Sequence, residues 1–232
     1  MRNFARVLLI ALFSIMLMNV SGQNVGIKFG SVWSKANLKY DVAADEPDQQ
    51  FLILPQLGVI FETPIYNGLF LQTGIMASVN GYRYDSKRMV DDESGNPIEV
   101  DSKERPILFY LSLPVDFGYK HMTSDKFGIF GMVGPVFRYL AYDTHSFKVN
   151  GEWDNESTDI EIDGEKKALF KSFDFALNIE AGVQYDRWKF SLYYNPGFTN
   201  IFNDDVIPDG SNAAWKNYSF GVNVAILFGT IE

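Results

Sequence analysis

Apolar and polar residues alternate with a period of two over much of this chain, and the clearest case runs from Ile107 to Tyr119. One parity there is apolar or aromatic throughout: Ile107, Phe109, Leu111, Leu113, Val115, Phe117 and Tyr119. The other parity carries Ser112, Pro114, Asp116 and Gly118. A period of two is typical of an extended strand with one apolar and one mixed face.

The same pattern recurs along the chain and predicts about eight strands. They are expected near residues 25–37, 51–63, 68–84, 107–119, 127–142, 173–185, 190–195 and 218–228. Pro55 would cost the second strand a ladder hydrogen bond, so a bulge or a strand end is expected there. An even number of antiparallel strands is typical of bacterial outer-membrane barrels.

The predicted connections alternate between short and long. Short turns follow the second, fourth and sixth strands, and the first contains Asn67-Gly68, which adopts positive φ at low cost. Long connections are expected at residues 38–50, 86–104, 144–168 and 203–214. Within the third, Asn150-Gly151 and Asp163-Gly164 look like hairpin tips, so the fifth and sixth strands are expected to project beyond the membrane.

A soluble β-sandwich also alternates, so other features must separate it from a membrane barrel. The apolar faces persist for about 10 residues, the length that a tilted membrane strand needs. The opposite faces are too polar for a sandwich core. Aromatic residues gather near strand ends, as interface girdles do: Trp33, Tyr82, Tyr84, Tyr119, Tyr139, Tyr185, Trp188, Trp215 and Tyr218. We therefore predict an all-β fold, an antiparallel up-and-down transmembrane β-barrel of about eight strands.

The first 22 residues have the three-part layout of a secretory signal. Arg2 and Arg6 form a basic start, residues 7–18 are apolar apart from Ser14, and Ser21-Gly22 offers a cleavage site. A membrane-anchoring helix is the alternative, but the apolar stretch is shorter than the ~20 residues that span a bilayer. We expect a signal peptide at residues 1–22 and a barrel domain at 23–232. The absence of Cys excludes disulfides, thiol catalysis and a lipid-anchored lipoprotein.

The formal net charge of −9 argues against nucleic-acid binding, because phosphate contacts need a basic surface. Much of the acidity lies in the long connections, where solvation is the simplest explanation. Residues 159–164 loosely resemble a calcium loop, but Phe170 stands where the bidentate Glu would be. No cofactor is expected, and loosely bound divalent cations remain an alternative for the acidic loops.

Catalysis has little support in the sequence. A serine-type site needs a base beside its nucleophile, and the only two histidines are His121 and His145. His145 neighbours Ser146 and Asp143, but adjacency along the chain does not make a triad. No phosphate-binding or dinucleotide glycine motif is present. We expect that the protein is not an enzyme.

Six charged residues fall on the parity assigned to the barrel interior: Lys28, Glu62, Asp116, Arg138, Asp174 and Glu180. Counting from the strand ends predicts an upper Arg138/Asp174 pair with Glu180 nearby. It also predicts a lower group of Lys28, Glu62 and Asp116. These residues could form a polar gate or proton path, or an ion-paired plug that holds a narrow barrel together. An eight-stranded barrel is just wide enough for its own side chains, which favours the plug.

The chain resembles the PorT-type, porin family outer-membrane β-barrel proteins of Bacteroidota over nearly its whole mature length. The segment Asn24-Val25-Gly26-Ile27-Lys28-Phe29-Gly30 resembles their first strand, and Leu111-Ser112-Leu113-Pro114-Val115 is similar to their Leu-x-Ile-Pro-Leu strand. Phe173-Asp174-Phe175-Ala176 and the later segment 194–201 resemble a Phe-Asp-Phe-Gly strand and a Tyr-x-x-Gly-Leu-x-Asn-Ile strand end. Ala176, Phe198 and the absence of a terminal aromatic residue depart from the family pattern.

The resemblance implies an outer-membrane barrel in a family whose members mostly lack an assigned role. The namesake takes part in protein secretion by the type IX system. We expect an integral outer-membrane protein of a Gram-negative bacterium, with extracellular long loops that serve a structural or interaction role. An accessory role in secretion and a narrow small-solute channel are the alternatives. Outer-membrane lipid and lipopolysaccharide, secretion-machinery proteins or other surface proteins are the expected partners.

Overall fold

The computed structural model describes residues 23–39, 49–91, 97–149, 152–156, 158–162, 165–206 and 214–229. The predicted signal peptide, residues 1–22, lies outside the described residues. So do the two predicted hairpin tips at residues 150–151 and 163–164.

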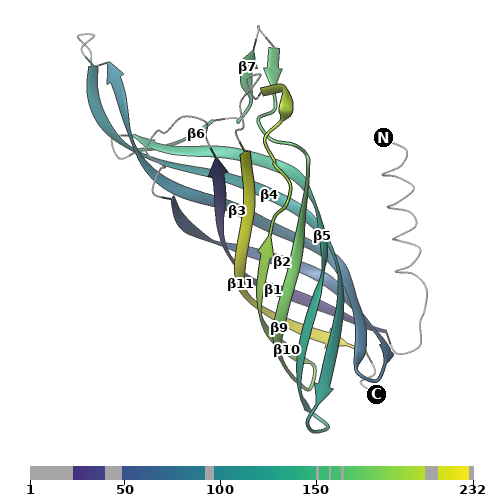
Figure 1. Cartoon of the computed structure of the whole chain (residues 1–232). Coiled ribbons are helices and arrows are strands. Elements are labelled where there is room, and N and C mark those ends of the chain that lie inside the picture. Colours follow the sequence, from purple (N-terminus) through teal and green to yellow (C-terminus); the bar gives the residue numbers. More distant parts are fainter. Residues whose placement is uncertain are drawn as a thin grey trace.

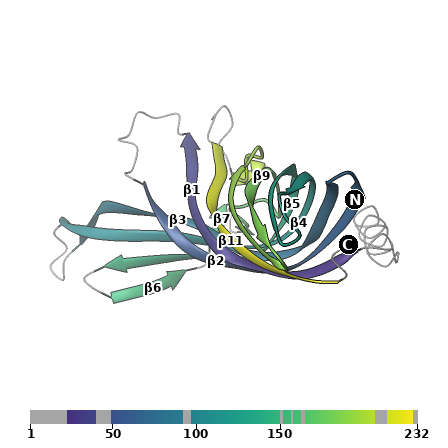
Figure 2. The ribbon, with the colours of Figure 1, turned by 90° about the horizontal axis from the view of Figure 1, so that it is seen from below.

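Eight long strands form a closed antiparallel ring (Figures 1 and 2). They are β1 (Asn24–Lys39), β2 (Gln49–Tyr66), β3 (Leu69–Asp91), β4 (Pro97–Met122), β5 (Phe127–Val149), β9 (Phe173–Tyr185), β10 (Trp188–Pro196) and β11 (Ala214–Phe228). Each long strand pairs with its sequence neighbours among the eight, and the β1–β11 pairing closes the ring. The predicted all-β barrel is confirmed.

Shorter elements lie between β5 and β11. Strand β6 (Glu152–Glu156) pairs with the end of β5, and β7 (Ile160–Ile162) pairs with β8 (Glu165–Lys167). A 3-10 helix, η1 (Asp204–Val206), precedes β11. The expected strand extension is present for the fifth predicted strand, because β5 continues past residue 142 to Val149, and absent for the sixth, because β9 begins at Phe173.

In the part of the chain that the structure describes, no helix is long and apolar enough to cross a membrane.

The prediction of a long loop at residues 86–104 is wrong. Strands β3 and β4 continue as a paired ribbon from Tyr84↔Glu104 to Asp91↔Pro97, and this ribbon reaches away from the ring in Figures 1 and 2. Most residues here are polar on either parity, and Val90, Ile98 and Val100 do not continue into a regular series, so the apolar alternation that marks the ring strands is lost. Backbone hydrogen bonds still extend the two strands, because pairing does not require an apolar face.

The short turns and the pairing of β1 with the end of β11 lie at one end of the ring, which we call the short-turn end. The turns fall at Asn67-Gly68, residues 123–126 and Asp186-Arg187. Asn67 and Gly68 have φ of 46° and 84°, as predicted for an Asn-Gly turn. We call the opposite end the long-loop end. The bulge expected at Pro55 is confirmed by a register shift between Phe51 and Gln56.

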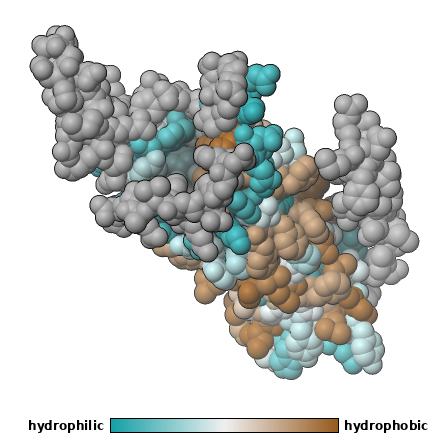
Figure 3. Space-filling model, turned by 45° about the horizontal axis from the view of Figure 1, so that its top comes forward, coloured by the Kyte–Doolittle hydropathy of each residue, from teal (hydrophilic) through white to brown (hydrophobic). Residues whose placement is uncertain are grey.

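The outer wall of the ring carries exposed apolar side chains, which we call the outer belt (Figure 3). Its members include Ile27, Phe29, Leu57, Val59, Ile75, Leu111, Val133, Ile179, Leu192 and Val222. Alternate residues of the same strands are buried and mostly polar, including Gln72, Asn80, Asp116, Asn178 and Asn223. The ring is therefore apolar outside and polar inside, the reverse of a sandwich.

Several predicted girdle residues do lie on the outer wall. Tyr119, Tyr139, Tyr185 and Trp188 are exposed there. The prediction is wrong for Tyr82 and Trp215, which are buried and belong to a cluster that Tyr84 packs against. These residues have the parity of the polar interior, and the structure places them where that interior meets the long-loop end.

Candidate functional site in the barrel interior

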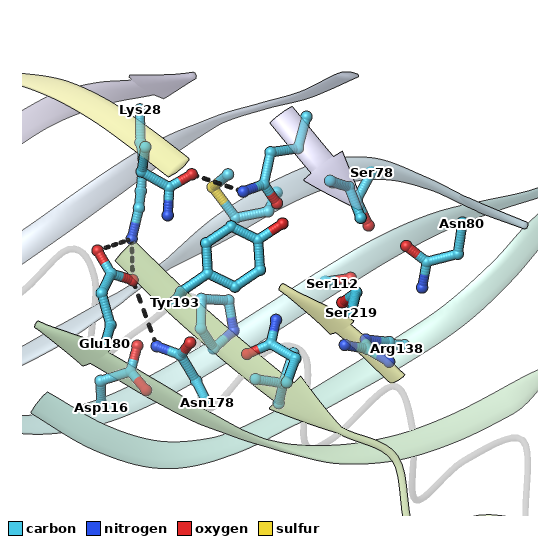
Figure 4. Close-up of a pocket in the computed structure, with 17 residues that line it drawn as sticks. Lys28, Ser78, Asn80, Ser112, Asp116, Arg138, Asn178, Glu180, Tyr193 and Ser219 are labelled. Carbon is cyan, nitrogen blue, oxygen red and sulfur yellow. Dashed lines mark hydrogen bonds and ion pairs between the residues drawn. The ribbon is translucent and has the colours of Figure 1, made fainter. Parts of the chain in front are cut away.

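Lys28 and Glu180 form an ion pair between β1 and β9 (Figure 4). The Lys28 Nζ lies 2.7 Å from Glu180 Oε2, and both side chains are buried. Ser191 of β10 donates its hydroxyl to Glu180 Oε1 at 2.6 Å, and Asn178 Nδ2 donates to Oε2 at 3.4 Å. One carboxylate thus accepts hydrogen bonds from three side chains, as a buried charge requires.

Glu62 of β2 holds two lysines closer to the short-turn end. Its carboxylate oxygens lie 2.5 Å from Lys189 Nζ and 2.6 Å from Lys120 Nζ. Lys189 also donates to Gln72 Oε1 at 3.2 Å, and its Nζ lies 4.1 Å from the ring centroid of Phe130. The carboxylate and the ring face together replace the water that this buried ammonium has lost.

Arg138 of β5 and Asp174 of β9 form a third ion pair, with Arg138 Nη1 3.2 Å from Asp174 Oδ2. The two residues are direct partners in the β5–β9 register. Arg138 also lines an interior cavity of about 50 Å³, together with Lys28, Asp116 and Glu180 (Figure 4). Neither carboxylate oxygen of the buried Asp116 accepts a hydrogen bond from a described residue. A polar cavity of this size can hold a few water molecules, which would solvate that carboxylate.

An apolar cluster, which we call the cap, lies at the long-loop end of the interior. Its buried members are Ala36, Tyr82, Leu108, Tyr110, Phe170, Ile201 and Trp215. The Trp215 ring packs edge-on against Phe170 and Tyr82, with centroid distances of 4.7 Å and 4.9 Å. Phe170 and Ile201 come from segments outside the eight ring strands, so the chain after β8 and the chain after β10 both contribute to the cap.

Backbone hydrogen bonds hold these two segments to each other and to β11. The Lys171 amide donates to the Ile201 carbonyl at 2.7 Å, and the Asn203 amide donates to the Leu169 carbonyl at 2.9 Å. The Ile201 amide donates to the Trp215 carbonyl, also at 2.9 Å. The cap is thus a bonded layer over the polar interior.

The short-turn end has an open hollow of about 770 Å³. Glu62, Lys120, Phe70 and Gln184 line it, together with residues of the first two turns. The ion-paired residues Glu62, Lys120 and Lys189, which we call the Glu62 group, therefore lie where the interior meets this hollow.

All six charged residues predicted for the interior are buried. The structure brings Arg138 and Asp174 together as predicted, but the remaining grouping is different. Glu180 pairs with Lys28 rather than lying with Arg138, and Glu62 pairs with neither Lys28 nor Asp116. Barrel strands tilt and are staggered, so equal counts from the strand ends do not give equal heights.

Sequence reasoning missed two interior lysines, Lys120 and Lys189. Each lies one residue beyond a predicted strand end, since the strands were expected to end at Tyr119 and to begin at Phe190. Lys120 has the parity of Asp116, and Lys189 has the parity of Ser191. Extending the alternation by one residue would have found both.

The two histidines are not part of a catalytic arrangement among the described residues. His121 is exposed at the short-turn end. His145 Nε2 lies 3.0 Å from Glu104 Oε2 near the long-loop end, and Ser146 has the opposite strand parity to His145. No group of three His, Cys, Asp or Glu within the described ranges is placed to hold a metal ion. Phe170, at the position that a calcium loop would give to Glu, is buried in the cap.

Comparison with known proteins gives a family match over most of the chain. The family model described as "Outer membrane protein beta-barrel domain" matches residues 21–203. None of the curated proteins matches the sequence.

Solved structures give more distant similarities. Neisserial surface protein A is 11% identical with a TM-score of 0.38, covering 90% of this chain and 98% of its own. OprG from Pseudomonas aeruginosa is 14% identical with a TM-score of 0.35, covering 90% and 95%. Ail of Yersinia pestis is 12% identical with a TM-score of 0.31, covering 89% and 100%.

Proposed function

Since this chain belongs to the outer membrane protein beta-barrel domain family, we propose that it is an integral outer-membrane barrel with an interaction role and a closed interior. The wall anchors the protein in lipid, and the strands beyond the cap present a contact surface. The short-turn end faces the periplasm and the long-loop end faces the cell exterior, as in barrels with short periplasmic turns. The proposal includes no catalysis.

The observation that carries this proposal is the way the interior is filled. Lys28–Glu180 and the Glu62 group link strands that are not neighbours in the ring, Arg138–Asp174 links the neighbouring strands β5 and β9, and the cap covers the long-loop end. Eight strands leave an interior just wide enough for side chains. Moving a solute through it would break buried ion pairs, each break leaving an uncompensated charge.

The contact surface is supported by the strands that continue past the cap. The β3–β4 ribbon remains paired to Asp91↔Pro97, and β6 adds a further strand beside the end of β5. Paired strands hold a fixed shape, so they suit recognition better than a free loop does.

Three measurements test the proposal. The refolded protein should migrate differently on gels before and after heating, and it should show no conductance steps in a planar bilayer. Steady, salt-dependent steps from the folded form would overturn the closed interior and support the small-solute channel. A photo-crosslinker at Lys166, which is exposed at the long-loop end, should capture surface partners in native membranes. Lys126, exposed in a short turn, is the matched control position.

A PorT-like accessory role in secretion is a second proposal, and the motifs at Phe173–Ala176 and residues 194–201 favour it. The same crosslinking pair separates the two roles. A secretion component would crosslink to its machinery from the Lys126 position, whereas a surface-interaction protein would crosslink mainly from Lys166.

A further inference from the structure

One edge of strand β3 extends past its neighbour in the ring. Strand β2 pairs with β3 on this side as far as Gln49↔Tyr84, whereas β3 itself continues to Asp91. Among the described residues, no strand pairs with residues 85–91 of β3 on this side. We call these seven residues the free β3 edge. They belong to the ribbon that reaches away from the ring in Figures 1 and 2.

The hydrogen bonds of β3 show which backbone groups this edge presents. The Lys120 amide of β4 donates to the carbonyl of Gly68, the residue before β3, at 2.8 Å. The β3–β4 register then continues to the end of β3 without a shift. Hydrogen-bonded and non-hydrogen-bonded pairs alternate in an antiparallel ladder, so the even-numbered residues of β3 bond to β4. On the opposite side, the Gly81 amide donates to Ser34 Oγ of β1 at 2.6 Å. Odd-numbered residues therefore direct their N–H and C=O groups toward the free β3 edge.

Four residues of the free β3 edge have this outward direction: Asp85, Lys87, Met89 and Asp91. None of them is proline, so each offers one backbone donor and one backbone acceptor. Alternate residues repeat about every 7 Å along a strand, and a second extended chain presents its own donors and acceptors at the same spacing. An unpaired row of this kind is a template for the addition of another strand.

The opposite edge of the ribbon is a poorer template. Strand β5 pairs with β4 only from Ser102↔Val149 onward, so residues 97–101 of β4 extend past it. Since the even-numbered residues of β4 bond to β3, the odd-numbered ones point to this side. Pro97 has no N–H, which leaves the amides of Glu99 and Asp101 in this part of β4. The free β3 edge offers twice as many.

The chain segment before β2 is too short to fill the free β3 edge. Residues 40–48 connect β1 to β2 and lie outside the described residues. A segment that ran along all seven edge residues and returned to Gln49 would need at least 14 residues, twice seven, whereas this connection has nine. Any complete partner for the edge must therefore come from elsewhere.

We infer that the free β3 edge binds an extended segment of a partner protein, which adds a strand beside β3 where β2 has ended. Main-chain hydrogen bonds provide the affinity in this mode of recognition. The inference rests on the proposed function, because it names the class of partner that the contact surface at the long-loop end takes.

A second copy of this chain is the less suitable partner. Strand β3 runs from the short-turn end toward the long-loop end, so it runs in the same sense in every copy within one membrane. Two free β3 edges would then meet in parallel, which is the less stable pairing. A separate extended segment can enter in the antiparallel direction.

Amide hydrogen exchange of the full-length protein in detergent tests first whether the edge is open. The Lys87 and Met89 amides should exchange at least tenfold faster than the Arg88 and Val90 amides, which bond to β4. Slow exchange at all four positions in the monomeric protein would overturn the inference, because the edge would already have a partner.

A displayed library of short random peptides is the probe for strand addition. Peptides selected on the full-length protein should slow exchange at Lys87 and Met89 and leave Arg88 and Val90 unchanged. Met89→Pro should weaken their binding about tenfold or more, because it removes an outward N–H and places a ring in the path of the added strand. Lys87→Pro is a second variant in case the first fails to fold. Protection of the Arg88 and Val90 amides verifies that the ribbon remains paired.

The matched control is Glu99→Pro, at the direct partner of Met89 in the β3–β4 register. Its N–H points to the opposite edge of the ribbon, so peptide binding should be retained. Equal weakening by this control, undiminished binding by both edge variants, or failure to select any peptide that protects the edge amides would overturn the inference. Protection that appears only as the protein associates with itself would overturn the choice of partner.

The inference and the proposed function fail separately. If Met89→Pro leaves crosslinking of surface partners from the Lys166 position unchanged, the contact surface stands and strand addition is overturned. A conducting lumen would overturn the closed interior, but it would leave the exchange pattern and the peptide binding unaffected.

Discussion

Lys28 on β1 and Glu180 on β9 are 152 residues apart in sequence, yet their charged atoms lie 2.7 Å apart inside the barrel. Two other strands, β10 and β11, separate β1 from β9 in the sheet order. The ion pair therefore spans the lumen rather than following the ladder, and it ties together strands that share no backbone hydrogen bonds.

Removing one member of this pair should destabilise the barrel strongly. Lys28→Met leaves Glu180 charged and buried, so the free energy of unfolding should fall by about 3–5 kcal/mol. Urea unfolding in detergent, followed by tryptophan fluorescence, measures this change. Adding Glu180→Gln removes the uncompensated charge and should recover most of the loss. An unfolding curve unchanged by Lys28→Met alone would contradict the importance of the pair.

The Glu62 group should respond asymmetrically to substitution. Glu62→Gln leaves two neighbouring ammonium groups without their shared carboxylate, whereas Lys120→Met leaves Lys189 paired with Glu62. Lys120 is also partly exposed, with 17% of its side-chain surface accessible against 3% for Lys189. The loss of unfolding free energy should therefore be largest for Glu62→Gln and smallest for Lys120→Met. Equal losses for the two substitutions would show that the group does not act as one unit.

A destabilising substitution in the cap should unfold the cap locally while the ring strands stay folded. Phe170→Ala removes a buried ring from a layer that lies over the barrel interior, and it should cost the cap about 3–5 kcal/mol. The Lys171 and Asn203 amides, which donate within the cap, should then exchange their hydrogens at least tenfold faster. The exchange of mid-strand amides in β9 serves as the internal control. Acceleration throughout the barrel would show that the cap and ring are one cooperative unit.

A charged substitution in the outer belt should lower the free energy of unfolding more the closer it lies to the bilayer midplane. Ile179 lies at the centre of β9 and Tyr185 at its short-turn end, and both are exposed on the outer wall. Ile179→Arg should cost about 2–4 kcal/mol and Tyr185→Arg about 0–1 kcal/mol, because only the first lies at the bilayer midplane. Unfolding from lipid vesicles measures both. Equal costs at the two positions would contradict the assignment of this surface to lipid.

The ring strands could be predicted from the sequence because a membrane barrel imposes one rule on every strand. Outward residues meet lipid and inward residues meet a polar lumen, so the alternation survives even in β9, which has a charged residue at Asp174 and another at Glu180. The β3–β4 ribbon escaped prediction because polar residues predominate on both parities there and the regular apolar alternation is lost. Its two strands are paired through the backbone, whose hydrogen bonds do not depend on residue type.

The predicted interior residues were correct in direction but only partly correct in pairing. Direction follows from parity, a local property, so Lys28, Glu62 and Asp116 were all placed inside. Pairing depends on how far the strands are staggered around the ring, which no single strand encodes. Arg138 and Asp174 were matched because β5 and β9 are neighbouring strands whose residues can both be counted from the short-turn end, whereas Lys28 and Glu180 meet only when the ring closes.

The sequence by itself determined that strands alternate between lipid and lumen and that six charges point inward. Only the tertiary structure decided which charges meet and that aromatic residues such as Tyr82 and Trp215 close the interior. The physical reason is that the pleat of each strand sets, residue by residue, whether a side chain points outward or into the lumen. Contact across a barrel is set by tilt and stagger, which depend on all eight strands together.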